Sequence, residues 1–277
     1  DAPTVSSAIA DASNAEDAAY SLDVSGNFAD VDVGDTLSFA ATGMPSTLTM
    51  STSGTISGTP VNADVGTHTI IVTATDSSSA AATASDTFVL TVTNTNDAPT
   101  VSSAISDAST AEDSAYSLDI SGNFADSDVG DSLSFTASGL PSTLSMSSAG
   151  TISGTPVNAD VGAHTIIVTA TDDSSAAGTV TDTFVLTVTN TNDVPTVSSA
   201  IADASTAEDS AYSLDVSGNF ADVDATDTLS YAATGMPSTL SMSSAGTISG
   251  TPVNADVGAY TIIVTVTDSS SAAATAS

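Results

Sequence analysis

The chain repeats itself with a period of 96 residues. Asp1, Asp97 and Asp193 each open a D-A/V-P-T-V-S-S-A-I unit, and the string S-G-T-P-V-N-A-D-V-G recurs at 57–66, 153–162 and 249–258. The units of a solenoid run to roughly 20 to 50 residues and cannot bury a core alone. A unit of about 100 residues can bury a modest core by itself. We therefore predict three successive small domains, over residues 1–96, 97–192 and 193–277.

Hydrophobic residues alternate with polar ones along each unit. Period-two alternation is typical of strands with one buried face, and Gly-, Pro- and Asp-containing turns separate these segments every 8 to 15 residues. No helical periodicity is present. We predict an all-β chain of tandem immunoglobulin-like Greek-key β-sandwiches with about seven strands each, although the Cys and Trp hallmarks of antibody domains are missing. The alternating residues of the first unit include Tyr20, Leu22, Val24, Leu37, Phe39, Ile70, Val72, Ala74, Phe88, Leu90 and Val92.

The third copy of the repeat is shorter than the other two. Ser277 corresponds to Ser85, so the counterpart of residues 86–96 is missing and we expect the third sandwich to lack its final strand. Either a longer array has been cropped, or a strand from a neighbouring molecule completes the sandwich. The chain also begins within the pattern and without Met, so we expect a processed piece or a fragment.

The charge balance excludes several classes of function. The chain has no Lys, no Arg and 33 Asp plus Glu, with a formal net charge of -33. Phosphate backbones need cations to neutralise them, so we expect no nucleic-acid binding, and anionic membrane surfaces repel such a chain. No apolar run approaches the roughly 20 residues needed to span a bilayer, so we expect no membrane insertion. The absence of Cys excludes disulfides and thiolate metal sites. Cations are the implied partners, because acidic groups at this density repel one another.

Acidic residues gather at predicted strand ends and turns. The first unit has Glu16-Asp17, then Asp30-x-Asp32-x-x-Asp35, Asp76, and Asn94-Thr95-Asn96-Asp97 at its boundary. Oxygen ligands from several loops suit calcium, which takes six to eight of them. Converging carboxylates without a basic partner would raise one another's pKa, and a divalent ion removes that conflict.

These motifs resemble the calcium-binding elements of cadherin repeats. A-E-D near the start, D-x-D, A-T-D closing a long strand and N-x-N-D-x-P at the boundary carry the resemblance. The strings L/M-P-S-x-L and S-G-T-P-x-x-x-D-V-G are more similar still to bacterial cadherin-like domains of the dystroglycan type. In cadherins the ions lie between successive domains and take ligands from both.

The resemblance implies a ligand set for each junction. The first would use Glu16, Asn94, Asn96, Asp97, Asp126, Asp128 and Asp172. The second would use Glu112, Asn190, Asn192, Asp193, Asp222, Asp224 and Asp268. A preceding domain would face Asp1, Asp30, Asp32 and Asp76, and a following domain would face Glu208.

Two departures from the cadherin pattern reduce the number of charged ligands. The D-R-E element has no counterpart, and the linker reads N-x-N-D-A-P where cadherins have D-x-N-D-N-x-P. These departures imply one or two ions per junction rather than three. In the third repeat Ala225-Thr226 replaces Val-Gly, which is expected to alter the loop beside Asp224.

Other interpretations of the polar residues stay open. Asp in a turn commonly bonds nearby backbone amides, which applies to Asp64, Asp160 and Asp256 and competes with metal binding for Asp35, Asp131 and Asp227. Because Tyr260 stands where His68 and His164 stand in the other copies, we assign this position to packing or strand-edge surface. We expect no enzymatic activity, since no Ser lies in a nucleophile elbow and Asp30 with Asp32 are neighbours on one loop.

Three functions fit these observations. The first is an extracellular structural or adhesive array, a calcium-rigidified stalk of a bacterial surface adhesin in which neighbouring repeats share the ions. The second is a subunit of a self-assembling extracellular filament or sheath, a homopolymer completed by strand donation. The third is a repeat module of a secreted enzyme or carbohydrate binder, although no exposed aromatic cluster supports sugar stacking.

Overall fold

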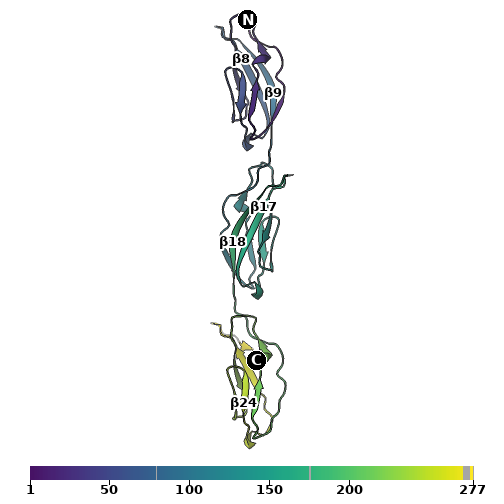
Figure 1. Cartoon of the computed structure of the whole chain (residues 1–277), viewed down its shortest axis with the longest axis vertical. Coiled ribbons are helices and arrows are strands. Elements are labelled where there is room, and N and C mark those ends of the chain that lie inside the picture. The colour runs from purple at the N-terminus through teal and green to yellow at the C-terminus, as the bar shows by residue number, and fades with distance from the viewer. Residues whose placement is uncertain (79, 175, 271–274, 277) are drawn as a thin grey trace.

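Three β-sandwiches follow one another along the chain in an extended row (Figure 1). The computed structural model describes residues 1–78, 80–174, 176–270 and 275–276. Its only helical segments in these ranges are short 3-10 turns. No helix in the described ranges is long and apolar enough to cross a membrane.

The first repeat packs a four-stranded sheet against a three-stranded one, with a two-residue strand pair beside them. The larger sheet has the order β2-β9-β8-β5, the smaller one β3-β7-β6, and the short pair is β1-β4. Strand β2 runs parallel to β9, and the other pairs are antiparallel. The elements are β1 Thr4–Val5, β2 Ala12–Ala15, β3 Tyr20–Asp23, η1 Ser25–Asn27, β4 Phe28–Ala29, β5 Ser38–Thr42, β6 Leu48–Met50, β7 Thr55–Gly58, η2 Asn62–Asp64, β8 Gly66–Thr75 and β9 Thr83–Thr93.

The second repeat has the same sheets, β11-β18-β17-β14 and β12-β16-β15 with the pair β10-β13. Its elements are β10 Thr100–Val101, β11 Ala108–Ala111, β12 Tyr116–Asp119, η3 Ser121–Asn123, β13 Phe124–Ala125, β14 Ser134–Ser138, β15 Leu144–Met146, β16 Thr151–Gly154, η4 Asn158–Asp160, β17 Gly162–Thr171 and β18 Thr179–Thr189.

The third repeat keeps part of this arrangement, with the sheets β20-β24-β23 and β22-β25-β26 and the pair β19-β21. Its elements are β19 Thr196–Val197, β20 Tyr212–Asp215, η5 Ser217–Asn219, β21 Phe220–Ala221, β22 Ser230–Thr234, β23 Leu240–Met242, β24 Thr247–Gly250, η6 Asn254–Asp256, β25 Ile263–Thr267 and β26 Thr275–Ala276.

The alternation in the sequence sets which side chains form the core. On β8, Ile70, Val72 and Ala74 are fully buried, whereas Ile71 between them is 44% exposed. Phe88, Leu90 and Val92 of β9 complete the same core. The predicted all-β sandwich is confirmed, and its seven longer strands divide four and three between the sheets. The additional pair β1-β4 has two residues in each strand, too few to produce an alternation signal.

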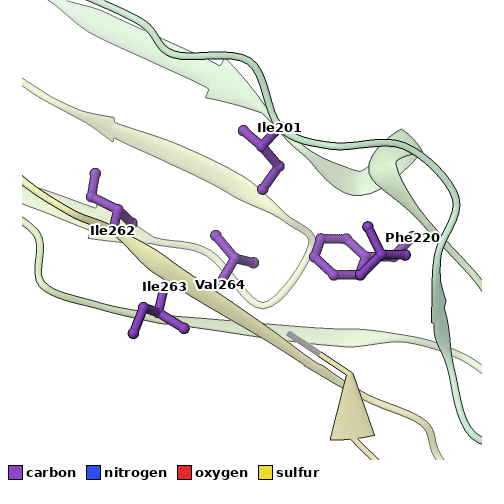
Figure 2. Close-up of a pocket in the computed structure, with 6 residues that line it drawn as sticks. Ile201, Phe220, Ile262, Ile263 and Val264 are labelled. Atoms are coloured by element: carbon purple, nitrogen blue, oxygen red, sulfur yellow. The ribbon is translucent and has the colours of Figure 1, made fainter.

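The third sandwich has a more open core than the other two. Ile9 and Ile70 of the first repeat are 6% and 0% exposed, but their counterparts Ile201 and Ile262 are only partly buried. Figure 2 shows Ile201, Ile262 and Val264 around a pocket that Phe220 also lines. In the first repeat the long strand β9 contributes side chains to the core at this face. In the third repeat the two-residue strand β26 stands in the place of the start of β9, and it pairs with β25 in the same register in which Thr83 and Ala84 of β9 pair with β8. Ser277, which corresponds to Ser85 in the 96-residue repeat, lies outside the described residues.

Candidate metal centres at the repeat junctions

The end of β2 carries a buried glutamate to the junction with the next repeat. Because β2 pairs in parallel with β9, Glu16 lies where β9 leaves the sheet, and its amide donates to Thr93 O at 3.0 Å. Its side chain is 2% exposed, and Oε1 accepts a 2.9 Å hydrogen bond from Thr95 N in the linker. Oε2 is buried and finds no hydrogen-bond partner among the described residues. Such an oxygen is costly unless a partner satisfies it.

Glu112 repeats this geometry at the second junction. It is 1% exposed, and its Oε1 accepts from Thr191 N at 2.9 Å. Its Oε2 is also buried with no partner in the described part of the chain. The same buried, half-satisfied carboxylate thus occurs at both junctions.

The linker asparagines connect this glutamate to the next repeat. One end of the Asn94 amide lies 3.0 Å from Glu16 Oε1 and 3.3 Å from Asp128 Oδ1. If Asn94 Nδ2 occupies this end of the amide, it donates to the carboxylates of both Glu16 and Asp128. If a cation lies between these carboxylates, Asn94 Oδ1 can face them instead. Asn96 Nδ2 donates to Asp172 Oδ2 at 3.2 Å, while Asn96 Oδ1 is buried without a partner among the described residues.

The D-x-D loop of the second repeat meets the linker from the other side. Asp97 N donates to Asp128 Oδ2 at 2.7 Å, and Asp128 is 4% exposed. Asp126 Oδ1 accepts from Asp128 N at 3.0 Å, whereas its Oδ2 is buried with no described partner. Asp172 directly follows β17, and its carboxylate accepts hydrogen bonds from Ser174 and Gly178. The structure therefore brings the seven predicted residues of the first junction to one place.

The second junction reproduces most of these contacts. Asn192 Nδ2 donates to Asp268 Oδ2 at 3.2 Å, and Asp193 N donates to Asp224 Oδ2 at 2.7 Å. Asp224 is 2% exposed, with Oδ1 buried and unpartnered within the described ranges. Asn190 is exposed.

Burial and like charges raise the pKa of carboxylates at the second junction. Burial raises the pKa of Glu112, and the negative charges of Asp113, Asp224 and Asp193 add to the shift. Burial also raises the pKa of Asp193, with contributions from Asp113 and Asp224. Asp172 differs, because hydrogen bonds from Ser174, Asn96 and Gly178 outweigh burial and lower its pKa. A divalent cation would remove the repulsion that raises the pKa values of Glu112 and Asp193.

Several residues at the junctions were not predicted. Asn62, in η2, donates through Nδ2 to Asp97 Oδ2 at 2.7 Å, and Asn158 makes the same contact with Asp193. The recurring N-A-D of S-G-T-P-V-N-A-D-V-G was the available signal. Asp113 also reaches the second junction from a backbone with φ of 57°, a conformation that Asp adopts more readily than most residues.

The predicted ligands at the outer ends have different surroundings. The amine of Asp1 pairs with Asp32, matching the contact of Asp97 N with Asp128. Asp76 is 4% exposed, and Asp30 Oδ1 accepts from Asp32 N. Glu208 is exposed, unlike Glu16 and Glu112, because residues 204–207 form no strand in the described structure.

The turn interpretation is confirmed for the aspartates that follow N-A. Asp160 is 2% exposed and accepts from Ser142 N, Ser142 Oγ, Thr143 Oγ1 and Val157 N, at 2.8, 2.9, 2.6 and 3.2 Å. Burial opposes its ionisation, but these bonds outweigh burial and lower its pKa to about 2. Asp64 has the same partners in the first repeat and also a lowered pKa.

The histidines lie beside these turns. Nε2 of His68 lies 2.7 Å from Asp64 O, and Nε2 of His164 lies 2.7 Å from Asp160 O. Each imidazole is thereby held at the start of a long strand, and both histidines are partly buried, a position that fits either packing or strand-edge surface. Tyr260, at the same position in the third repeat, is 43% exposed.

Without calcium, we expect stability to be highest at mildly acidic pH. The raised pKa values of Glu112 and Asp193 mean that the folded state binds these protons more strongly, so stability falls as pH rises through them. The lowered pKa values of Asp64 and Asp160 contribute stability that is lost as pH falls below their ordinary value of 3.8. Thermal unfolding in chelator should show a maximum at about pH 4 to 5. A midpoint that rises steadily up to pH 8 would contradict this balance of charges.

A family model described as "Putative Ig domain" matches residues 2–93, 98–189 and 194–277. The chain belongs to this Ig-domain family. Its three matches coincide with the three sandwiches and meet at the linkers that carry Asn94 to Asp97 and Asn190 to Asp193. Among curated proteins, the sequence comparison finds no match.

Solved structures of cadherin ectodomains share the arrangement of these Ig-like repeats. Mouse cadherin-23 EC22-24 has a TM-score of 0.61 at 16% identity, over 99% of this chain and 96% of that one. Human CDH23 EC21-23 has a TM-score of 0.54 at 16% identity, over 87% of each chain. Protocadherin gamma B2 domains 1-5 has a TM-score of 0.56 at 16% identity, and this chain spans 58% of its length. At these identities the likeness shows the fold, a tandem array of cadherin-like sandwiches.

Proposed function

We propose that the chain is an extracellular structural array in which calcium stiffens the junctions between Ig-like repeats, as part of the stalk of a bacterial surface adhesin. The observation that carries the proposal is the pair of buried glutamates, Glu16 and Glu112. Each Oε2 has no hydrogen-bond partner among the described residues and lies in a chain without Lys or Arg. The cadherin resemblance of the surrounding motifs supports calcium as the ion. No catalytic role is proposed.

The mechanism is mechanical. The carboxylate of Glu16 belongs to one repeat, and Asp128 and Asp172 belong to the next. In the linker, Asn94 contacts both Glu16 and Asp128, Thr95 N donates to Glu16, and Asn96 donates to Asp172. An ion held by these oxygens fixes the angle between the two repeats, because bending the junction would pull ligands away from it. Binding also stabilises both repeats, since the complete site exists only when both are folded.

Small-angle scattering tests this function. We expect the maximum dimension of the chain to be larger and more sharply defined in calcium than in chelator, because an unstiffened linker samples bent arrangements. The double variant Glu16→Gln with Glu112→Gln should lose most of this response, while Glu208→Gln should keep it. An unchanged maximum dimension in calcium and chelator would contradict the proposal.

A second candidate is a subunit of an extracellular filament assembled by strand donation. What favours it is the partly exposed apolar face around Ile201 and Ile262 in the third repeat (Figure 2). In the other two repeats β9 and β18 contribute side chains to the core at this face. An extended segment that alternates as Phe88, Leu90 and Val92 do would complete that sheet. Electron microscopy of concentrated protein should then show fibres, and isolated short rods would argue against this candidate.

A further inference from the structure

The outer face of the larger sheet carries no charge in the first two repeats, although the chain has 33 Asp plus Glu. On β8 the residues that point away from the core are Thr67, Thr69, Ile71, Thr73 and Thr75. Those of β9 are Thr, Ser and Val, and those of β2 and β5 are Ser, Ala and Thr. Strands β11, β18, β17 and β14 present the same kinds of residue. Every residue of these eight strands is described, and we call the two surfaces the neutral faces.

The only acids within these eight described strands lie on the inner side of the sheet. Asp86 of β9 pairs with the buried Val72, and cross-strand partners share one face of a sheet. Its Oδ2 accepts a 2.6 Å hydrogen bond from Ile9 N. Asp182 of β18 is placed in the same way and accepts from Ile105 N at 2.7 Å. The remaining acids of the first two repeats lie outside these strands, so the neutral faces stay uncharged.

Strand propensity alone does not account for the neutral faces. Thr and Val are favoured in strands and Asp is disfavoured, yet Asp23 of β3 and Asp119 of β12 are exposed on the outer face of the smaller sheet. The neutral faces also leave Ile71 and Ile167 44% and 43% exposed, on strands that lie inside the sheet order and not at its edge. Exposed apolar side chains without neighbouring charge are typical of the core of a protein interface.

We propose that the neutral faces bind a second copy of this chain, sheet against sheet. A basic partner would be recognised by carboxylates, which these faces lack. Two chains with a net charge of -33 repel each other, and the repulsion is weakest where both facing surfaces are uncharged. Acids at the ends of a sandwich lie about 17 Å from the centre of the face, beyond the Debye length of about 8 Å. This docking goes beyond the proposed function and uses neither the junction carboxylates nor the apolar face of the third repeat.

The size and twist of a neutral face determine the kind of contact. Strands of 10 and 11 residues extend about 34 Å, and with the shorter outer strands each face offers about 500 Å². A standard stable interface buries about 800 Å² on each partner, so one such contact is weak and forms at high local concentration. Twisted sheets pack face to face at about 30°, and the long strands follow the length of the row (Figure 1). Two chains should therefore cross, and each neutral face meets a different neighbour.

Sedimentation of the full chain in calcium, over a range of protein concentrations, tests this docking. We expect the mean mass to rise with concentration. The double variant Ile71→Asp with Ile167→Asp should weaken association by about tenfold or more, because charge would enter both faces. The matched double variant Thr49→Asp with Ser145→Asp adds the same charge to exposed positions of the smaller sheet, and it should change association by less than about twofold.

Two further double variants separate docking from folding. Ile71→Thr with Ile167→Thr keeps the faces uncharged and β-branched, so most of the association should remain. Thr69→Asp with Thr165→Asp places charge at other exposed positions of the same faces and should weaken association as the first pair does. Thermal unfolding of dilute protein checks that each variant is folded.

The outcomes distinguish the docking from the junction function. A chain that stays monomeric at every concentration would show that no second copy docks. Equal weakening by acids on the larger and the smaller sheet would also contradict the proposal, because general repulsion would explain both. The effect of calcium on the maximum dimension, measured on dilute protein, should be the same in all these variants. Absence of that effect in the unmodified chain would overturn the junction function and leave the docking intact.

Discussion

Replacing Glu112 by Gln is expected to have opposite effects with and without calcium. In chelator, the neutral amide avoids both the cost of burying a charge and the repulsion from Asp113, Asp224 and Asp193, so the second repeat should gain stability. In calcium the variant lacks a ligand and should lose most of the stabilisation by the ion, which is about 2.7 kcal/mol at 100 times the dissociation constant. Hydrogen exchange followed by mass spectrometry measures both effects on β17 and β18.

Glu208→Gln is the matched control for this change. Glu208 has the same A-E-D setting but is exposed, so its replacement should alter stability little in either condition. The first junction of the Glu112 variant provides a second control, because Glu16 is untouched. Equal destabilisation with and without calcium would mean that Glu112 has a structural role and holds no ion.

Replacing Asp160 by Ala is expected to destabilise the second repeat by about 2 to 3 kcal/mol. The substitution leaves the backbone amides of Ser142 and Val157 without their buried acceptor, and charged hydrogen bonds of this kind contribute more than neutral ones. For a domain of this size each kcal/mol corresponds to a shift of about 4–8 °C in the unfolding midpoint. Calorimetry should show one of the unfolding transitions moving down while the others stay.

Asp119→Ala controls for the loss of a turn aspartate in the same repeat. Asp119 also accepts from a backbone amide, that of Ser121 at 2.9 Å, but it is exposed and water can replace it. We expect a loss of less than about 1 kcal/mol. If both variants lose the same stability, burial of the Asp160 carboxylate is not what makes the turn important.

Most of the fold could be predicted from the sequence because each unit carries its own periodic signal. The alternation of Ile70, Val72 and Ala74 marks a strand whose inner face is buried, and the structure buries these side chains completely. The two-residue strands β1 and β4 could not be predicted, since two residues have no period. Nor could the parallel pairing of β2 with β9, because it joins residues 12–15 to residues 90–93.

The candidate ligands of the junction could be predicted only where they belong to a recognisable sequence motif. Glu16, Asp128 and Asp172 stand in such motifs, and the structure places them around one linker. Asn62 was missed because its side chain reaches Asp97 only after η2 turns it toward the linker. From the sequence, Asp35 could not be distinguished from an aspartate that only bonds the backbone of its own turn. Its carboxylate lies near those of Asp30 and Asp76 only once the loop folds so that Asp35 N bonds to Asp32 O.

A crystal structure of the calcium-loaded chain, with anomalous data collected to locate the ions, tests the central claim most directly. At the second junction we expect an ion about 2.3–2.6 Å from Glu112 Oε2, with carboxylates of Asp222 or Asp224 of the next repeat in the same coordination shell. Anomalous density at both buried glutamates would establish that the repeats share their ions. Junctions without such density, with Glu112 Oε2 bonded to an ordered water or to a neighbouring amide, would contradict the account.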